Sequence, residues 1–321
     1  VFIKPDGKKV TVTIGEDPSD PVFCITDLLP HLAADQYKKT LGEGIPGEGL
    51  DVVAGSIPVK EKDRKEKFKY NVLKLLRAKY GVTETDFQSA ELEIVPAGRP
   101  REAGLDRSMI LAYGHDDRVC AYAGLKALLD LKGIPEYTST VLLCDKEEIG
   151  SVGSTGMAAN FFENSAAELL NLTTASYSEL VLKRALSNSW MLSADVNALF
   201  DPMFPSVSEK RNSAYLNHGV CVTKYCGSRG KSGSSDASAE FMAHIRRIFD
   251  RAGVIWQTGE LGKVDQGGGG TIAYLMARYG MKVIDCGVGL FSMHAPMELA
   301  GKLDIYMAYK GYHAFLKDGR K

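Results

Sequence analysis

Several features that would assign a protein to a common class are absent from this sequence of 321 residues. No apolar run approaches the ~20 residues that a membrane span requires, and the amino end has no signal-peptide pattern. The net charge is only -1, which argues against binding to nucleic acid or to an anionic membrane. The six cysteines include no Cys-x-x-Cys pair and lie mostly inside apolar runs, which is typical of free thiols in a reducing cytosol. We therefore expect a soluble cytoplasmic protein.

Motifs of covalent catalysis and of phosphate binding are also missing. No serine lies in a Gly-x-Ser-x-Gly sequence, and no cysteine has a convincing histidine partner in its sequence context. The spacing Gly-x-x-x-x-Gly-Lys-Ser/Thr of a P-loop does not occur, and no Gly-x-Gly-x-x-Gly follows a predicted strand. These absences disfavour a serine or cysteine nucleophile and a nucleotide-binding loop.

The chain is long enough for two domains, and its pattern changes at the junction Pro96-Ala97-Gly98-Arg99-Pro100. We expect a smaller α+β domain over residues 1–98 and a larger domain over residues 99–321. In the smaller domain the sequence predicts a hairpin whose turn is Pro5-Asp6-Gly7. The other elements predicted there are strands over residues 10–14 and 89–95, and helices over residues 25–35 and 64–80.

The larger domain alternates predicted strands with predicted helices. The strands are expected over residues 109–112, 138–144, 190–194 and 281–285, and the helices over residues 119–131, 237–252 and 271–279. This alternation is typical of an α/β domain with a largely parallel sheet flanked by helices. In such a sheet, side chains that are distant in sequence converge beyond the carboxyl ends of the strands.

Potential metal ligands follow the strands of this domain, at Asp116-Asp117, Glu147-Glu148, Asp195 and His294. Carboxylates and imidazole with a water between them suit a pair of divalent ions, and such a pair needs one bridging ligand. Asp116 is the candidate for the bridge, because two nearby cations keep a buried carboxylate ionised. The sequence therefore predicts a two-metal hydrolase.

Some of these residues also have simpler explanations when each is taken alone. Asp116 or Asp117 can cap the helix that begins near Val119. An aspartate at a strand end, such as Asp195, is commonly a turn residue, and a lone histidine such as His294 is commonly structural. Only the joint pattern favours a metal site.

The adjacent pair Glu147-Glu148 is harder to explain without a metal. Two neighbouring carboxylates at the end of an apolar strand repel each other unless cations are near. Because neighbouring side chains in an extended segment point in opposite directions, one glutamate can bind metal while the other stays free as a base.

A glycine run, Gly267–Gly270, follows Asp265-Gln266 and opens a predicted helix. Such a run can bring backbone NH groups to an anion or a carboxylate. We interpret it as a tight turn beside the active site that holds a substrate carbonyl or terminus, with Asp265 and Gly268 as substrate-binding candidates.

Over nearly its whole length the sequence resembles the aspartyl aminopeptidase family of metallopeptidases. Four segments carry the resemblance: Gly114-His115-Asp116-Asp117-Arg118-Val119-Cys120, Asp145-Lys146-Glu147-Glu148-Ile149-Gly150-Ser151, Ser193-Ala194-Asp195-Val196-Asn197 and Ser292-Met293-His294-Ala295-Pro296-Met297-Glu298. Residues 25–34 and 90–98 are also similar to the dimerisation domain that interrupts the catalytic domain in this family.

The resemblance implies a role for each candidate residue. Asp116 would bridge two divalent ions, Glu148 and His294 would complete one of them, and Asp195 would bind the other. Glu147 would be the general base. The peptide bond that follows the bridging aspartate, here Asp116-Asp117, would be cis. Zinc is the expected metal, and cobalt and manganese tolerate the same ligands.

The resemblance also implies substrates and partners. The substrates would be peptides with an acidic or neutral amino-terminal residue, and the free α-amino group would bind a metal or a nearby carboxylate. Residues 1–98 would form a homodimer that assembles into a hollow dodecamer. His31 resembles a histidine that reaches into the active site of the partner subunit.

The sequence departs from the family pattern in one respect. The family uses an upstream His-x-Asp segment whose histidine binds the second ion, and no equivalent lies in this chain; His115-x-Asp117 has those letters but lies in the bridging motif. We therefore expect that an amino-terminal part of the catalytic domain is missing. The rival hypotheses are a glutamyl-aminopeptidase-like or aminoacylase-like dinuclear hydrolase, and a non-catalytic assembly piece that lacks the second metal.

Overall fold

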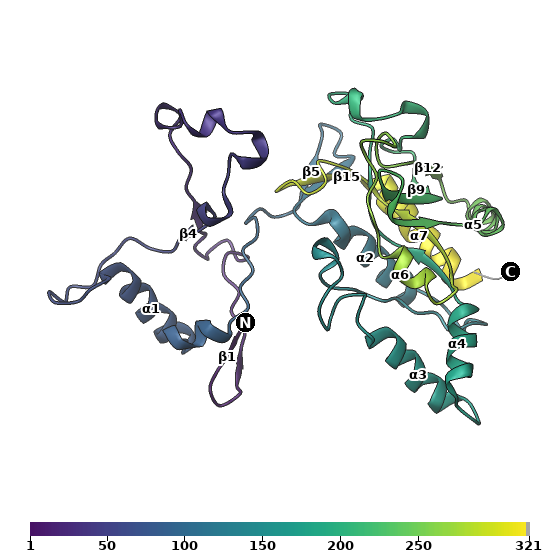
Figure 1. Ribbon diagram of the computed structural model, residues 1–321, viewed down its shortest axis with the longest axis horizontal. Coiled ribbons are helices and arrows are strands. Elements are labelled where there is room, and N and C mark those ends of the chain that lie inside the picture. Colours follow the sequence, from purple (N-terminus) through teal and green to yellow (C-terminus); the bar gives the residue numbers. More distant parts are fainter. Residues whose placement is uncertain (319–321) are drawn as a thin grey trace. The chain divides into compact units, whose positions relative to one another are not determined.

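The computed structural model describes residues 1–318, and the chain forms two compact units over residues 1–99 and 100–321 (Figure 1). Unit 1, residues 1–99, has little regular structure. Unit 2, residues 100–321, contains most of the helices and strands. Among the described helices, none combines the length and the apolar composition that crossing a membrane requires.

Unit 1 contains two short antiparallel ribbons, one long helix and several single turns of 3₁₀ helix. The ribbons are β1 (Phe2–Ile3) with β2 (Lys9–Val10), and β3 (Cys24–Ile25) with β4 (Val52–Val53). The helix is α1 (Lys67–Tyr80), which Gly81 ends with a φ of 68°. The 3₁₀ turns are Pro30–Leu32, Gln36–Lys38, Leu41–Glu43, Gly47–Gly49 and Glu84–Ser89.

The hairpin around Pro5-Asp6-Gly7 and the helix ending at Tyr80 confirm two predictions for this unit. The helix predicted over residues 25–35 is wrong, because only the 3₁₀ turn Pro30–Leu32 forms there. Pro30 lacks an N–H and disfavours helical backbone in the residue before it, so a helix cannot pass through this position easily. The strands predicted over residues 10–14 and 89–95 are also wrong, since beyond Val10 neither segment joins a ladder.

Unit 2 contains a four-stranded mixed sheet in the order β12-β9-β13-β7. Its strands are β7 (Trp190–Ser193), β9 (Val220–Thr223), β12 (Trp256–Thr258) and β13 (Lys282–Gly287). β12 is parallel to β9 and β7 is parallel to β13, whereas β9 and β13 are antiparallel. The two halves of this sheet therefore run in opposite directions.

A five-stranded sheet in the order β5-β6-β15-β14-β8 accompanies it. Its strands are β5 (Arg101–Ala103), β6 (Met109–Ala112), β8 (Asn197–Ala198), β14 (Gly289–Phe291) and β15 (Glu298–Gly301). β10 (Tyr225–Ser228) and β11 (Ser232–Asp236) form a separate hairpin. The antiparallel pair β6 and β15 matters for function, because the segments that carry two predicted metal ligands adjoin these strands.

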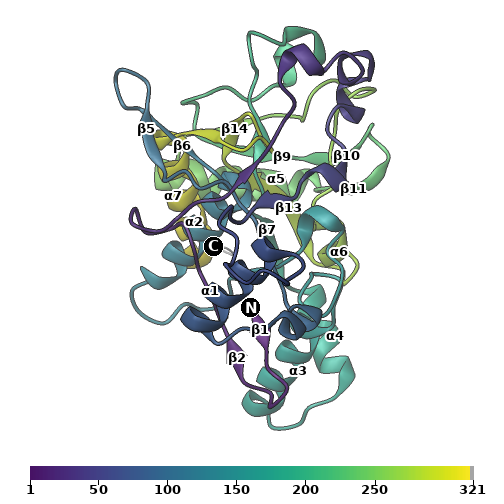
Figure 2. The ribbon, with the colours of Figure 1, turned by 90° about the vertical axis from the view of Figure 1, so that its left-hand side faces the viewer.

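The helices of unit 2 are α2 (His115–Leu129), α3 (Phe161–Thr173), α4 (Glu179–Ser187), α5 (Ala239–Ala252), α6 (Ala273–Ala277) and α7 (Lys302–Asp318). α7 packs against both α2 and α5, and α3 lies beside α4 in both views (Figures 1 and 2). Single turns of 3₁₀ helix occur at Glu147–Ile149, Pro205–Val207 and Lys210–Asn212. These elements and mixed sheets confirm the α/β prediction for the larger part of the chain.

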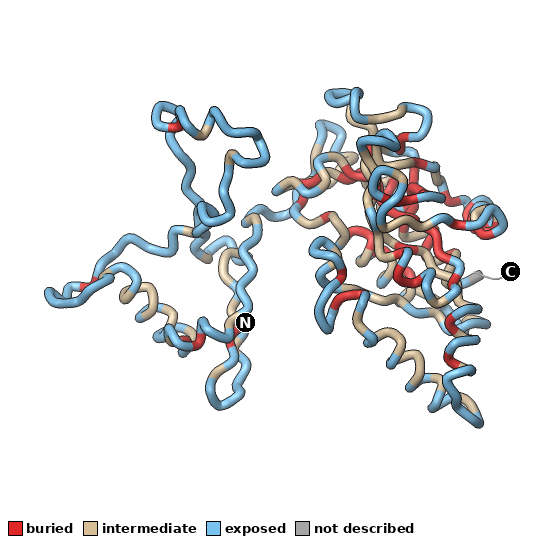
Figure 3. The backbone as a smooth tube through the Cα atoms, in the orientation of Figure 1, coloured by how far each residue is buried: buried red, intermediate tan, exposed pale blue. Residues whose placement is uncertain are grey.

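The core of unit 2 shows how the sequence pattern becomes packing. In α5 the buried residues Phe241, Ile245, Ile248 and Phe249 recur at helical spacing, so they form one apolar face. Ser238 caps the helix by accepting a hydrogen bond from the backbone N–H of Phe241 at 3.2 Å. Burying each such side chain contributes about 1.5–3 kcal/mol. In Figure 3 buried residues are red, and most of the red segments belong to unit 2.

Residues 138–144 differ from their prediction as a strand. They join no ladder in the described part of the chain, although 190–193 and 109–112 form strands where they were expected. A β-branched, apolar sequence favours extended backbone, but a strand also requires a neighbour with which to exchange hydrogen bonds. The local pattern was therefore insufficient at this segment.

Candidate metal centre

Three of the four predicted metal ligands come together in unit 2. The Nε2 atom of His294 lies 2.9 Å from Oδ2 of Asp116 and 3.4 Å from Oε1 of Glu148. One potential ligand atom from each residue lies within 4.8 Å of the others. The side chain of Asp116 is mostly buried, whereas those of Glu148 and His294 are open to solvent. The arrangement is an open cluster of two carboxylates and an imidazole.

Each ligand is delivered by a different chain segment. Asp116 follows β6 at the start of α2, and its peptide bond to Asp117 is cis, as expected. Glu148 lies in the 3₁₀ turn that begins at Glu147. His294 lies between β14 and β15, with a φ of 65°. Because β6 and β15 are antiparallel neighbours, the segments of Asp116 and His294 meet at the same edge of the sheet.

Glu298 holds two of these segments together. Its Oε2 accepts a hydrogen bond from the backbone N–H of Asp116 at 2.9 Å, and its Oε1 accepts one from the backbone N–H of His294 at 2.7 Å. Only 2% of Glu298 is exposed. In the sequence, Glu298 ends one of the four family segments, but nothing there predicts its function. The one feature that could have indicated it is an acidic residue directly before the apolar residues Leu299-Ala300 of a strand.

The electrostatics of the cluster favour a bound cation. Burial raises the pKa of Asp116, and the charge of Glu148 raises it further, while the charge of His294 opposes both. Burial is also the largest cause of the raised pKa of Glu147, followed by the charge of Glu148. Divalent cations stabilise carboxylates whose ionised forms are disfavoured in this way. A donor set of aspartate, glutamate and histidine therefore fits zinc.

Asp195 lines the same pocket but stands apart from the three clustered ligands. It is partly buried two residues beyond the end of β7, and its Oδ1 accepts a hydrogen bond from the backbone N–H of Val196 at 2.7 Å. Burial raises the pKa of Asp195 well above its usual value, and the charge of Asp116 adds to the shift. A Cβ atom at Gly287 would lie 1.4 Å from the carbonyl oxygen of Asp195, so only glycine fits beside this turn.

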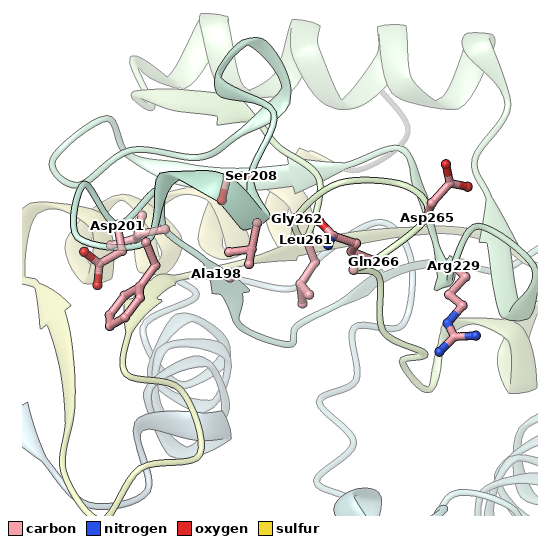
Figure 4. A pocket seen from close by; sticks show the side chains of 12 residues that line it. Ala198, Asp201, Ser208, Arg229, Leu261, Gly262, Asp265 and Gln266 are labelled. Carbon is pink, nitrogen blue, oxygen red and sulfur yellow. The ribbon is translucent and has the colours of Figure 1, made fainter. Parts of the chain in front are cut away.

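The pocket around these groups has a volume of about 300 Å³. Glu147 and Gly268 line it, so two more predicted site residues belong to this pocket. Asp265 instead lines a second cavity of about 550 Å³, where it lies with Arg229 and Gln266 (Figure 4). His31 is exposed and belongs to unit 1.

The glycine run is held by backbone and side-chain contacts. Gly268 donates its N–H to the carbonyl of Leu261 at 2.6 Å, and a Cβ atom at Gly268 would lie 2.1 Å from the carbonyl oxygen of Gly227. At the other end of the run, Thr271 donates a hydrogen bond to the buried carboxylate of Asp285 at 2.7 Å. This anchor was not predicted from the sequence, because Thr271 and Asp285 meet only when α6 packs against β13.

The fold and this donor set define a metal-dependent hydrolase of the α/β class. The family model "Aminopeptidase I zinc metalloprotease (M18)" matches residues 1–316. The chain therefore belongs to the M18 family of zinc metalloproteases, and it is a metalloaminopeptidase by class. This confirms the resemblance on which the predicted site rests.

Relatives agree with this assignment. A probable M18 family aminopeptidase 1 of Clostridium acetobutylicum is 54% identical over 318 residues, which cover 99% of this chain and 68% of the relative. The crystal structure of an M18 aminopeptidase from Thermotoga maritima matches with a TM-score of 0.94 and 46% identity, over 98% of this chain and 69% of that one. The crystal structure of aminopeptidase I from Clostridium acetobutylicum matches with a TM-score of 0.88 and 51% identity, over 99% and 68%.

Proposed function

We propose that this chain carries the site of a dinuclear aminopeptidase, which removes acidic or neutral amino-terminal residues from peptides. The observation that carries the proposal is the meeting of Asp116, Glu148 and His294, whose ligand atoms lie within 4.8 Å of one another. Asp195 and Glu147 line the same pocket. Five chemically suitable groups from four segments of the chain therefore face one cavity of a size that admits a substrate end.

We assign the metal ligands from this geometry and from the family. Asp116 would bridge two ions, Glu148 and His294 would complete one of them, and Asp195 would bind the other. Zinc is the proposed metal, with cobalt or manganese as alternatives. When bound, two divalent ions strongly lower the pKa of a water between them and polarise a peptide carbonyl.

Glu147 is the proposed general base. Its neighbour Glu148 contacts His294, whereas Glu147 lines the pocket outside the three clustered ligands. Glu147 would take a proton from the attacking water and pass it to the leaving amine. The α-amino group of the substrate would bind a metal or a nearby carboxylate, which restricts cleavage to the end of the peptide.

We also propose an assembly and a location. Unit 1 would be the dimerisation domain, and His31 would reach the active site of a partner subunit. The homodimer would assemble into a dodecamer, the form in which the mApe1 protein of S. cerevisiae, 23% identical, has been solved. A cytoplasmic location is supported by the six cysteines, all of which are free thiols.

Substituting Glu147→Gln tests the catalytic assignment. The change keeps the shape of the side chain but removes the base, so peptidase activity should fall by about 10²- to 10⁴-fold. Zinc content per chain should stay unchanged, as measured by mass spectrometry of the metal. Loss of zinc would mean that the roles of Glu147 and Glu148 have been exchanged. Cleavage of N-acyl amino acids, which have no free amine, would instead indicate an aminoacylase-like enzyme.

One observation favours a second candidate, a non-catalytic assembly piece. Among the described residues, Asp195 is not part of the cluster whose ligand atoms lie within 4.8 Å of one another, so the second ion has few ligands. Counting bound zinc separates the candidates. About two ions per chain supports the two-metal route, and none supports the scaffold.

A further inference from the structure

The pocket of the metal centre is lined by many acidic residues and, over the described part of the chain, by no lysine or arginine. Four of the acids, Asp116, Glu147, Glu148 and Asp195, have roles in the proposed mechanism. A fifth, Asp285, accepts a hydrogen bond from Thr271. The sixth is Glu260, which has no role in the proposed mechanism. In the described chain, no contact of its carboxylate indicates a role in holding the fold together.

The backbone of Glu260 is held firmly at the wall of this pocket. Its N–H donates to the carbonyl of Asn212 at 2.6 Å. The preceding carbonyl, that of Gly259, accepts a hydrogen bond from Oγ1 of Thr223 at 2.9 Å, and Thr223 in turn accepts one from Nδ2 of Asn197 at 2.7 Å. These hydrogen bonds therefore fix the backbone of Glu260 just beyond the end of β12.

The carboxylate of Glu260 is half-buried and lacks a partner. Among residues 1–318 it has no hydrogen-bond donor and no cation within 4.0 Å. Burial raises its pKa, and only the more distant charge of Lys224 opposes this shift. The ammonium of Lys224 is already paired with Asp236. No described cation of the protein therefore neutralises the carboxylate of Glu260, so its negative charge acts on any ligand that enters the pocket.

The cation that lines the neighbouring cavity does not cancel this charge. Arg229 and Asp265 line the second cavity, and in Figure 4 their charged ends point in different directions. The two cavities share Leu261 and Gly262, and Arg229 belongs only to the second. Around Glu260 the remaining wall includes apolar side chains, among them Leu261 and Val264.

We propose that Glu260 is a specificity-determining residue, which repels an acidic amino-terminal side chain and restricts the pocket to uncharged ones. The inference rests on the proposed function and narrows its substrates from acidic or neutral residues to neutral residues. A second negative charge in this pocket would lie near an unpaired carboxylate and find no arginine or lysine. At an effective dielectric constant of about 20, like charges several ångströms apart change affinity by about one to two orders of magnitude.

The test uses zinc-loaded protein in which Glu147→Gln prevents turnover, so that binding of peptides can be measured by calorimetry. The probes are the amides Gln-Ala-NH2 and Glu-Ala-NH2, which differ in one charge and hardly in shape. We expect Gln-Ala-NH2 to bind about 10- to 100-fold more tightly. Equal affinity, or tighter binding of Glu-Ala-NH2, would overturn the inference. Failure of both peptides to bind would instead remove the proposed function of this chain.

Variants at Glu260 identify the residue responsible. Glu260→Gln should reduce the discrimination between the two peptides by about tenfold, mainly through tighter binding of Glu-Ala-NH2. Glu260→Lys should reverse the preference. Glu168→Gln is the matched control, because Glu168 is exposed on α3 and its loss changes the net charge by the same amount. Discrimination that persists in Glu260→Gln, or that falls equally in Glu168→Gln, contradicts a local role for Glu260.

Zinc content distinguishes a role in selecting substrates from a role in supporting the metal centre. All Glu260 variants should bind as much zinc as the parent protein, since Glu260 lies outside the three clustered ligands. Loss of zinc in Glu260→Gln would show that the residue supports the metal centre and does not select the substrate.

Discussion

The two units of this chain differ most in how much of their apolar surface is buried. Unit 1 buries only five residues, namely Phe2, Ala33, Val59, Val82 and Asp86, whereas one core cluster of unit 2 joins strands to α2, α5 and α7. Figure 3 shows the same contrast along the backbone. In unit 1 many large apolar side chains are exposed, among them Leu28, Leu29, Leu32, Tyr37 and Leu41.

This difference shows that contacts within a single chain bury a core of apolar side chains in unit 2 but leave many of those in unit 1 exposed. Large numbers of exposed apolar side chains are unusual in a soluble protein, and where they gather they mark interaction sites. The contacts of unit 2 explain how it folds, whereas the described contacts of unit 1 leave many of its apolar side chains uncovered. This is the physical argument for the proposed dimerisation role of unit 1.

The largest effect is expected in the core of unit 2. Phe249 is fully buried between α5 and α7, where its ring lies against Gly311. Phe249→Ala should lower the free energy of unfolding by about 3–5 kcal/mol, because a cavity replaces the ring. Urea unfolding followed by fluorescence of Trp190 and Trp256, both in unit 2, measures this change. A loss below about 1 kcal/mol would contradict the importance of this packing.

The next effect concerns the buried carboxylate of Glu298. Glu298→Gln replaces one acceptor with an NH₂ group, which cannot accept from the backbone N–H of Asp116 or His294. Zinc affinity should fall by about 10- to 100-fold, as for other residues that orient metal ligands. Competition with a chelator measures the affinity, with Glu168→Gln as the control for charge. Unchanged affinity would show that the ligand segments keep their positions without Glu298.

An acid-dependent effect is expected in unit 1. Hydrogen bonds from Lys4 and Thr83 lower the pKa of Asp86 to about 2. Because the folded-state pKa lies below the usual 3.8, the stabilisation is complete above about pH 4 and is lost as the pH falls from 3.8 towards 2. NMR signals of the Phe2 and Phe87 rings, which pack edge to face, should report this loss.

Asp86→Asn is the control for that titration. The variant should be less stable at neutral pH, and its ring signals should no longer change between about pH 4 and 2. A transition that persists unchanged in the variant would assign the acid sensitivity to another group.

The smallest effect on folding is expected at the exposed surface of unit 1. Leu32 is 72% exposed, so Leu32→Ala should change the stability of the single chain by less than about 0.5 kcal/mol. If unit 1 forms the dimer, the same change should raise the dimer dissociation constant by about tenfold or more. Sedimentation equilibrium measures both species. An unaltered dissociation constant would remove Leu32 from the interface.

The contrast between the units also explains which predictions succeeded. α1, α5 and β6 were predicted because their residues carry a local pattern with clear ends, such as Gly81 after α1. The clustering of Asp116, Glu148 and His294 was predicted by placing each after an expected strand, although the strand expected before Glu148 does not form in the described chain. The prediction for residues 25–35 failed because Pro30 interrupts a helix there, and that for residues 138–144 failed because this segment has no neighbouring strand with which to form a ladder in the described chain. Glu298 was missed since its importance depends on hydrogen bonds to distant segments, and Glu260 since only the fold places it in the wall of the pocket.

Glu298 has a consequence for how quickly the site exchanges its metal. Because both oxygens of one carboxylate are engaged, the segments of Asp116 and His294 cannot swing outward separately. Much of the conformational entropy that binding would otherwise cost has therefore been lost during folding. A preorganised pair of donors of this kind favours slow release of an ion, so the holoenzyme should survive dilution into metal-free buffer for longer than the Glu298→Gln protein.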